Sequence, residues 1–319
     1  MKFELSHDQR DFATSLDDLL SRADAPRAAR AWAGGDHQPG LKLWRRLADA
    51  GVSALLVPEE DDGLGASAVE LVIAMEAIGR HAAPGPWIES AAYLATTPAA
   101  DIRKAIASGS VATVAVPTGT PYALDADVAD LVLTADDGAL RLAHVGDRVP
   151  SIDPVRRLFR TVPTGHRAAE VSVASWSTAA LAASAELLGA GERMLADSVS
   201  YVQQRTQFGR PIGSYQAIKH ALADVRIALD FVRPLVYAAA LHPLESSAER
   251  DRDVSAAKIA AGDAAWLAAR TALQVHGAIG YTREHDLSLW LLRVRGLMVT
   301  WGTARMHRVR VIDALTERH

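Results

Sequence analysis

The sequence contains no cysteine, so disulfide bridges and thiolate metal sites are excluded. It also has no uninterrupted apolar run that approaches the length of a membrane-spanning helix, and residues 1–6 show no apolar signal core. The net charge of −4 argues against a nucleic-acid-binding surface. Together these absences predict a cytoplasmic protein that neither binds nucleic acid nor inserts into a membrane.

The length and composition are those of a globular protein with a large core. Hydrophobic residues make up 49% of the 319 positions and charged residues 23%, which is ordinary for such proteins. A chain of this length is expected to fold as more than one layer or domain. Its patterns divide it into an N-terminal helical domain over residues 1–110, a reduced β domain over 111–173 and a C-terminal helical bundle over 174–319. The predicted fold class is therefore mainly α with a small central β domain.

The N-terminal region reads as a series of helices. Ser6 is placed to cap the first of them, and further helices are predicted over 41–50 and 67–80. The acidic run at 59–62 is a candidate cation site. Because no further ligands are grouped with it, a solvated acidic loop is the favoured interpretation.

Short β-like runs mark the middle of the chain. Residues 111–116, 130–134 and 139–142 are rich in aliphatic side chains, and 170–173 closes the region. The sequence Asp-Asp-Gly at 136–138 lies between two of these runs and predicts a hairpin turn.

Four segments with helical periodicity follow, roughly at residues 175–204, 214–241, 252–276 and 282–316, the last interrupted near Gly302. In the second segment, apolar residues recur every three or four positions from Tyr215 to Val236, which is the spacing of one buried helix face. Four such helices joined by short links predict an antiparallel four-helix bundle.

Residues 205–216 join the first two of these helices. The junction contains three residues that do not fit inside a helix and therefore predict a sharp reversal: Gly209, Pro211 and Gly213. At the reversal, Arg205 has the fork geometry that binds a phosphate, and Phe208 could cover the face of a ring. From the residues alone, a solvated cation and an apolar side chain that fills the corner are the simpler interpretation.

Three blocks of sequence resemble the acyl-CoA dehydrogenase family. Arg-Thr-Gln-Phe-Gly-Arg-Pro-Ile-Gly at 205–213 is similar to the signature of its C-terminal domain. Gln-Val-His-Gly-Ala-Ile-Gly-Tyr at 274–281 is similar to its Gln-x-x-Gly-Gly-x-Gly-Tyr segment. Residues 57–67 are similar to its Val-Pro-Glu-Glu-x-Gly-Gly-x-Gly loop, with Asp62 at the first glycine. The blocks occur in family order and span most of the chain.

The resemblance implies a reaction and a cofactor. Family members remove hydrogens from Cα and Cβ of an acyl-CoA and pass a hydride to FAD, which lies across a subunit interface. The residues of this chain that match the diphosphate and adenosine side are Arg205, Gln207, Phe208, Gln216, Gln274, His276, Gly277 and Ala278. Ala278 replaces the second glycine of the family's pair, and its methyl group limits how closely the backbone approaches a phosphate.

The family's flavin-ring side is poorly matched. The usual base is Glu in a Tyr-Glu-Gly-Thr-Ser segment, and the matching stretch here carries Trp301, whose indole accepts no proton. The alternative base position, on the first bundle helix, reads Ala179-Ala180. Glu186 lies about two turns further on, roughly 11 Å away, and is expected to be an ordinary acid on a helix face. No catalytic residue is therefore assigned in this chain.

Three hypotheses for function remain open. The favoured one is a short subunit of an FAD-dependent acyl-CoA dehydrogenase, in which a longer partner supplies the base and the flavin-ring pocket. It resembles the short subunits of α2β2 actinobacterial steroid-degrading dehydrogenases, and a steroid-derived acyl-CoA is implied by that resemblance alone. The alternatives are a self-sufficient homo-oligomeric dehydrogenase with an unrecognised base such as Glu186, and a non-catalytic scaffold or acyl-CoA-binding subunit. The histidines lack metal-ligand spacing, so no metal site is predicted.

Overall fold

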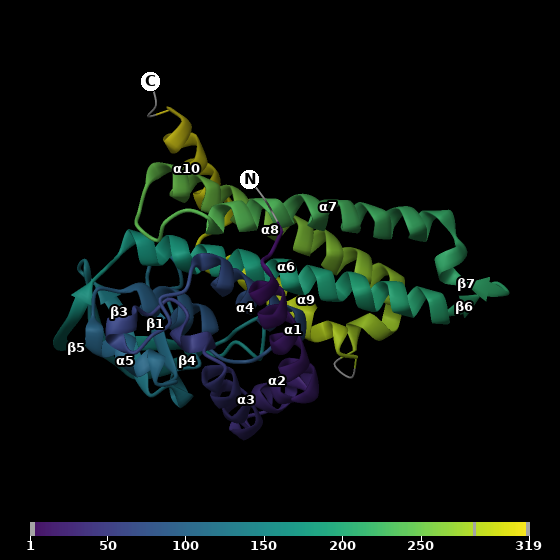
Figure 1. The fold of residues 1–319 in the computed structure, drawn as a ribbon. Helices are drawn as coiled ribbons and strands as arrows, with labels where there is room; N and C mark the ends of the chain where they lie inside the picture. The colour runs from purple at the N-terminus through teal and green to yellow at the C-terminus, as the bar shows by residue number, and fades with distance from the viewer. Residues whose placement is uncertain (1–3, 283–284, 317–319) are drawn as a thin grey trace.

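The computed structural model describes residues 4–282 and 285–316 and places a small sheet beside two groups of helices (Figure 1). The N-terminal helices are α1 His7–Arg22, α2 Ala25–Ala33, α3 Gln38–Asp49, α4 Ala68–His81 and α5 Ala100–Ala107, with a π-helix at Ile88–Tyr93. The C-terminal helices are α6 Val173–Gln204, α7 Gln216–Ala240, α8 Ala248–His276, α9 Leu287–Leu297 and α10 Ala304–Thr316. This arrangement confirms the predicted fold class.

The first helix begins where the sequence predicts. The Ser6 hydroxyl accepts from the Gln9 N–H at 3.2 Å, and the Gln9 side chain accepts from the Ser6 N–H at 3.0 Å. This reciprocal pair satisfies two backbone donors at the helix start. The helix then buries Leu16 and Leu20 against α4.

The acidic loop at 59–62 is not fully solvated, and the prediction was wrong for one of its residues. Asp61 is buried and accepts from Arg103 Nε at 2.7 Å. A carboxylate buried in this way is compensated by a paired guanidinium, which the sequence places 42 positions later. Within the described residues no group of three or more His, Cys, Asp or Glu side chains is placed to hold a metal ion.

The sheet consists of β1 Ala112–Ala115, β2 Ala123–Leu124, β3 Leu131–Asp136, β4 Ala139–Val149 and β5 Leu158–Glu170, in the order β1-β3-β4-β5-β2. Strands β1 and β3 are parallel and the other neighbours are antiparallel. The predicted turn is confirmed, because Asp137 and Gly138 both have positive φ and close the β3–β4 hairpin.

The end of the sheet differs from the prediction over 170–173. Strand β5 ends at Glu170, and Ser172 caps α6 by accepting from the Ser175 N–H. Most of β5 is exposed, so its sequence carries no apolar alternation that would mark it as a strand.

Helices α4 and α6 cross with their backbones in contact. A Cβ on Gly189 would lie 1.9 Å from the Glu76 carbonyl oxygen, and a Cβ on Gly79 would lie 2.1 Å from the Glu186 carbonyl oxygen. A Cβ at either position would overlap the facing carbonyl group, so only glycine allows the two helices to lie this close. The crossing joins the N-terminal helices and the bundle into one hydrophobic core.

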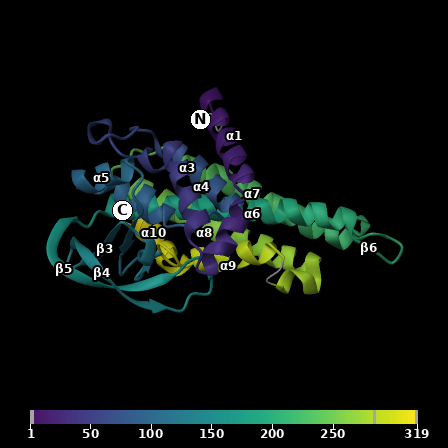
Figure 2. The ribbon, with the colours of Figure 1, turned by 90° about the horizontal axis from the view of Figure 1, so that it is seen from below.

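The bundle confirms the predicted helix pattern. The apolar series along α7 buries Val225, Leu229, Val232 and Val236. The last predicted segment is interrupted, since α9 ends at Leu297 and α10 begins at Ala304. Helices α6 and α7 extend past the rest of the molecule and carry the short β6–β7 hairpin at their tip (Figure 2). In the described part of the chain, every helix is too short or too polar to cross a membrane.

Candidate cofactor site

The reversal at the end of α6 is a tight hairpin. Strand β6 Thr206–Gln207 pairs with β7 Arg210–Pro211, and the turn between them uses positive φ at Phe208 and Gly209. The Phe208 side chain is 92% exposed, so the interpretation that it fills the corner was wrong. The ring is therefore free to contact a ligand or another protein.

Arg205 stands at the base of this hairpin. Its N–H donates to the Tyr201 carbonyl at 2.9 Å, and its carbonyl accepts from the Ile212 N–H at 2.8 Å. These two bonds fix the backbone of Arg205 in both directions. Its exposed guanidinium has no hydrogen-bond or ion-pair partner among the described residues. The charge is therefore available to an anion.

The hairpin is braced by its own side chains. The Arg210 guanidinium lies over the Tyr215 ring, 4.1 Å from its centroid, and the Tyr215 hydroxyl donates to the Gln207 carbonyl at 3.4 Å. Gln216 follows as the exposed first residue of α7.

The second predicted segment lies at the end of α8. Gly277 terminates the helix with φ 62° and ψ −138°, a conformation that favours glycine, and its N–H donates to the Leu273 carbonyl. Gln274 and Ala278 are exposed on either side of it. His276 is different, because it is buried and its Nδ1 lies 2.8 Å from the Ala272 carbonyl. Burial lowers the pKa of His276, which favours the neutral ring.

The two segments meet at one end of the bundle. The rings of Tyr201 and His276 stack with centroids 4.3 Å apart, which joins the end of α6 to the end of α8. A free guanidinium, an exposed aromatic ring and exposed amides suit the diphosphate and adenine of FAD in charge and chemistry. The eight residue assignments stay predictions. Sequence reasoning missed Tyr201, although it lies one helical turn before Arg205.

The position expected to match the family's base carries an indole. Trp301 is 0% exposed, has φ 55°, and donates its backbone N–H to the Gly119 carbonyl at 2.9 Å. Its ring stacks on Tyr93 with centroids 4.9 Å apart. A Cβ on Gly119 would lie 2.7 Å from the Trp301 ring. The ring is therefore closed in between the sheet, the π-helix and the bundle.

Two buried titratable groups, one on the π-helix that carries Tyr93 and one on α10, favour their neutral forms. The Glu89 carboxyl is fully buried without a hydrogen-bond partner among the described residues, and burial raises its pKa, which favours the protonated acid. His307 lies with Nε2 3.0 Å from the Trp301 carbonyl oxygen, and burial lowers its pKa to about 4. Glu89 was not singled out from the sequence, because one acid in an apolar run carries no recognisable pattern.

Glu186 is not a free acid on a helix face, as had been expected. It is buried and accepts from Arg293 Nη1 at 2.7 Å, while Arg293 Nε donates to Asp153 at 2.9 Å. The other candidate base position, Ala179-Ala180, is buried in the core. Glu186 therefore neutralises a buried cation, and its carboxylate is committed to that contact.

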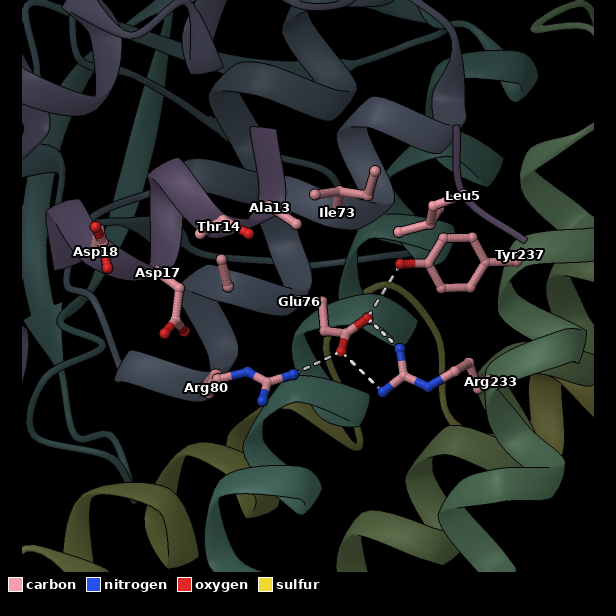
Figure 3. A pocket seen from close by; sticks show the side chains of 11 residues that line it. Leu5, Ala13, Thr14, Asp17, Asp18, Ile73, Glu76, Arg80, Arg233 and Tyr237 are labelled. Carbon is pink, nitrogen blue, oxygen red and sulfur yellow. Dashed lines mark hydrogen bonds and ion pairs between the residues drawn. The ribbon is translucent and has the colours of Figure 1, made fainter. Parts of the chain in front are cut away.

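Two further concave regions lie among the helices. A cavity of about 360 Å³ between α1, α4 and α7 is lined by polar groups that bind one another, since Glu76 accepts from Arg80, Arg233 and Tyr237 (Figure 3). A mainly apolar cleft of about 500 Å³ lies between α10 and the start of α6, with Trp176, Arg305 and Arg310 in its lining. In the first, Glu76 and its partners neutralise one another. The second adjoins the closed Trp301 compartment through Trp176.

Comparison with known proteins agrees with this architecture. Residues 6–100 match the acyl-CoA dehydrogenase N-terminal domain and residues 170–316 match the acyl-CoA dehydrogenase C-terminal domain. Acyl-CoA dehydrogenase IpdE2 of Mycobacterium tuberculosis is 34% identical over 288 residues, which cover 87% of this chain and 88% of the relative.

Two solved structures have a similar fold over nearly the whole chain. The ChsE4-ChsE5 complex from Mycobacterium tuberculosis aligns with a TM-score of 0.82 at 25% identity over 99% of both chains. A variant of the Tcur3481-Tcur3483 steroid ACAD aligns with a TM-score of 0.83 at 21% identity over 98% of both chains. With both terminal domains matched and a relative of this similarity aligned over most of its length, this chain belongs to the acyl-CoA dehydrogenase family.

Proposed function

We propose that this chain is the non-catalytic subunit of a heteromeric FAD-dependent acyl-CoA dehydrogenase, and that it supplies the diphosphate and adenosine side of a FAD site completed by a longer partner. The observation that carries the proposal is a contrast within one chain. The hairpin of Arg205 and Phe208 reaches outward with its binding groups free, whereas the base position is filled by the closed-in indole of Trp301.

The residues of this chain would bind and orient the cofactor without touching the reacting atoms. Arg205 would fork onto the diphosphate, the Phe208 ring would cover an apolar face, and Gln207, Gln216 and Gln274 would add amide hydrogen bonds. Gly277 would allow the backbone to approach a phosphate. FAD, when bound, supplies the hydride acceptor for the α,β-dehydrogenation of an acyl-CoA.

The base would come from the partner. Trp301 cannot accept a proton, Ala179 and Ala180 offer none, and Glu186 is held by Arg293. The geometry of Glu186 therefore gives no support to a self-sufficient homo-oligomer that uses it as base.

A second exposed surface supports a partner subunit. Along α7, Ile227, Phe231 and Leu235 are spaced by four residues and are 53%, 73% and 43% exposed. Such an apolar stripe on a long helix is typical of a face that packs against another protein. The similarity to the ChsE4-ChsE5 complex supports a partner of the same family, and we propose an α2β2 assembly acting on a steroid-derived acyl-CoA.

The test is to purify the complex of this chain with its longer partner, count flavins per chain and assay acyl-CoA oxidation. The expected result is two FAD per four chains, with neither flavin nor activity on this chain alone. One FAD per subunit on the isolated chain, with turnover, would show a self-sufficient enzyme. An assembled complex with no flavin would show a scaffold.

A point variant locates the site on this chain. We expect Arg205→Ala to weaken FAD retention by the complex about 10- to 100-fold, since a charge-assisted hydrogen bond contributes about 1.5–3 kcal/mol. Arg22→Ala is the matched control, because Arg22 is also an exposed arginine at a helix end. Equal flavin content in both variants would show that Arg205 is an ordinary surface charge with no role in FAD binding.

A further inference from the structure

The stack between Tyr201 and His276 lies between the two predicted cofactor-binding segments. Tyr201 precedes Arg205 by one turn of α6, and His276 directly precedes Gly277 at the end of α8. The ring planes are 26° apart and the centroids 4.3 Å apart, which is a close offset stack. The contact therefore lies where it can help to set how far one segment stands from the other.

Each ring is also tied to the backbone it positions. The carbonyl of Tyr201 accepts from the Arg205 N–H at 2.9 Å, so a shift of Tyr201 moves the base of the hairpin. On the other side, His276 is held by the Ala272 carbonyl and by close packing, because a Cβ on Gly280 would lie 3.2 Å from the His276 Cβ. His276 is thus the fixed member of the pair, and Tyr201 is the member it locates.

The position of the hairpin depends on the ends of α6 and α8, which the stack joins. Beyond it, the hairpin at 205–211 is exposed at every position, so no core side chains hold it from outside. A diphosphate that binds both segments must span a fixed gap between them. Displacements of about 1 Å are enough to lose much of the benefit of preorganised contacts.

We propose that Tyr201 is a positioning residue for the cofactor, which sets the Arg205 hairpin at the correct distance from the Gln274–Ala278 segment. The inference rests on the proposed FAD site and names a residue that does not itself touch the cofactor. Its aromatic face is what matters, and its hydroxyl is dispensable.

The experiment uses the assembled complex with the wild-type partner and measures the FAD dissociation constant by flavin fluorescence. We expect Tyr201→Leu to raise the constant about tenfold, equivalent to about 1.4 kcal/mol. Tyr201→Phe should stay within about twofold of wild type. Tyr122→Leu, a tyrosine of the β domain, is the control and should leave FAD binding unchanged. At saturating FAD, kcat and the KM for acyl-CoA should be unchanged in Tyr201→Leu, because the reacting atoms lie on the partner's side.

Several outcomes would overturn the proposal. An unchanged dissociation constant in Tyr201→Leu would show that the stack does not position the hairpin, and a fall in kcat at saturating FAD would show that Tyr201 acts on the chemistry. If leucine prevents folding, Tyr201→Met removes the aromatic face with a flexible side chain that adapts to irregular gaps, and a constant equal to that of wild type would contradict the inference. A wild-type complex without flavin would refute the proposed function and this inference together, whereas normal flavin with insensitive Tyr201 variants would refute only the inference.

Discussion

Replacing Trp301 with glutamate restores the residue type that the family uses as its base, and we expect it to cost stability without producing activity. The indole is fully buried and stacked on Tyr93, and loss of a buried tryptophan costs about 3–5 kcal/mol. A carboxyl without a partner adds about 1–3 kcal/mol. Together the two effects are expected to lower the unfolding free energy by about 5 kcal/mol, a value in the lower half of the summed range.

The expected fall in Tm follows from the size of the chain. An unfolding entropy of about 2.1 cal/mol/K per residue over 319 residues gives about 0.7 kcal/mol/K, so the Tm should drop by about 7 °C. Differential scanning calorimetry measures this shift, and an acyl-CoA oxidation assay on the chain alone should stay at background. Under the proposed function the flavin ring lies on the partner's side, so a carboxyl at position 301 would have no hydride acceptor beside it.

Trp266→Glu is the matched control for this variant. Trp266 is only half-buried on α8, where the Arg295 guanidinium lies 4.8 Å from its ring centroid, so the same chemical change should lower the Tm by only about 1–2 °C. A Trp301→Glu chain that melts within about 2 °C of wild type would show that the compartment is not closed. Acyl-CoA oxidation by that variant alone would show that the chain holds a complete pocket.

Three further variants test the interior. Gly189→Ala should lower the unfolding free energy by about 3 kcal/mol through overpacking against the Glu76 carbonyl, which corresponds to a fall in Tm of about 4 °C. An unchanged Tm would mean that α4 and α6 can move apart to accommodate the methyl group at no cost. Burial lowers the pKa of Lys258 to about 7, so the unfolded chain binds more protons above pH 7 and wild-type stability should rise by about 1.4 kcal/mol per pH unit towards pH 10. Urea unfolding at pH 7, 8 and 9 should show that Lys258→Met removes this slope, and equal slopes would contradict the burial argument. Glu186→Gln should leave acyl-CoA oxidation by the complex unchanged. It should lower the unfolding free energy by about 2 kcal/mol, because Arg293 loses one of its carboxylate partners. An inactive complex with an intact fold would instead identify Glu186 as the base.

Local patterns made most of the helices predictable. The spacing of apolar residues from Val225 to Val236 identified the buried face of α7, and the Ser6 cap fixed the start of α1. These signals work because a helix repeats every 3.6 residues and leaves its first donors unsatisfied. Strand β5 was missed because its exposed residues carry no apolar alternation.

The site was less predictable because it depends on contacts between distant residues. Glu186 meets Arg293, which is 107 positions away, and Asp61 meets Arg103, so neither carboxylate could be judged from its neighbours in sequence. Phe208 was expected to be buried because aromatic rings at helix corners usually are. Its exposure follows from the two-residue turn at the tip of a helix pair, where the molecule offers no core to receive it.

The fit between Trp301, Tyr93 and Gly119 also bears on how such a chain can evolve. Because the indole needs a glycine opposite it and a ring beside it, a glutamate that arrives at position 301 alone meets surroundings built for another side chain. The first step back towards a base is then a destabilised protein with no gain in activity, which selection would remove before the neighbouring residues could change. Under the proposed function, dependence on a partner subunit would in this way become entrenched, so we expect the two genes to be inherited and lost together.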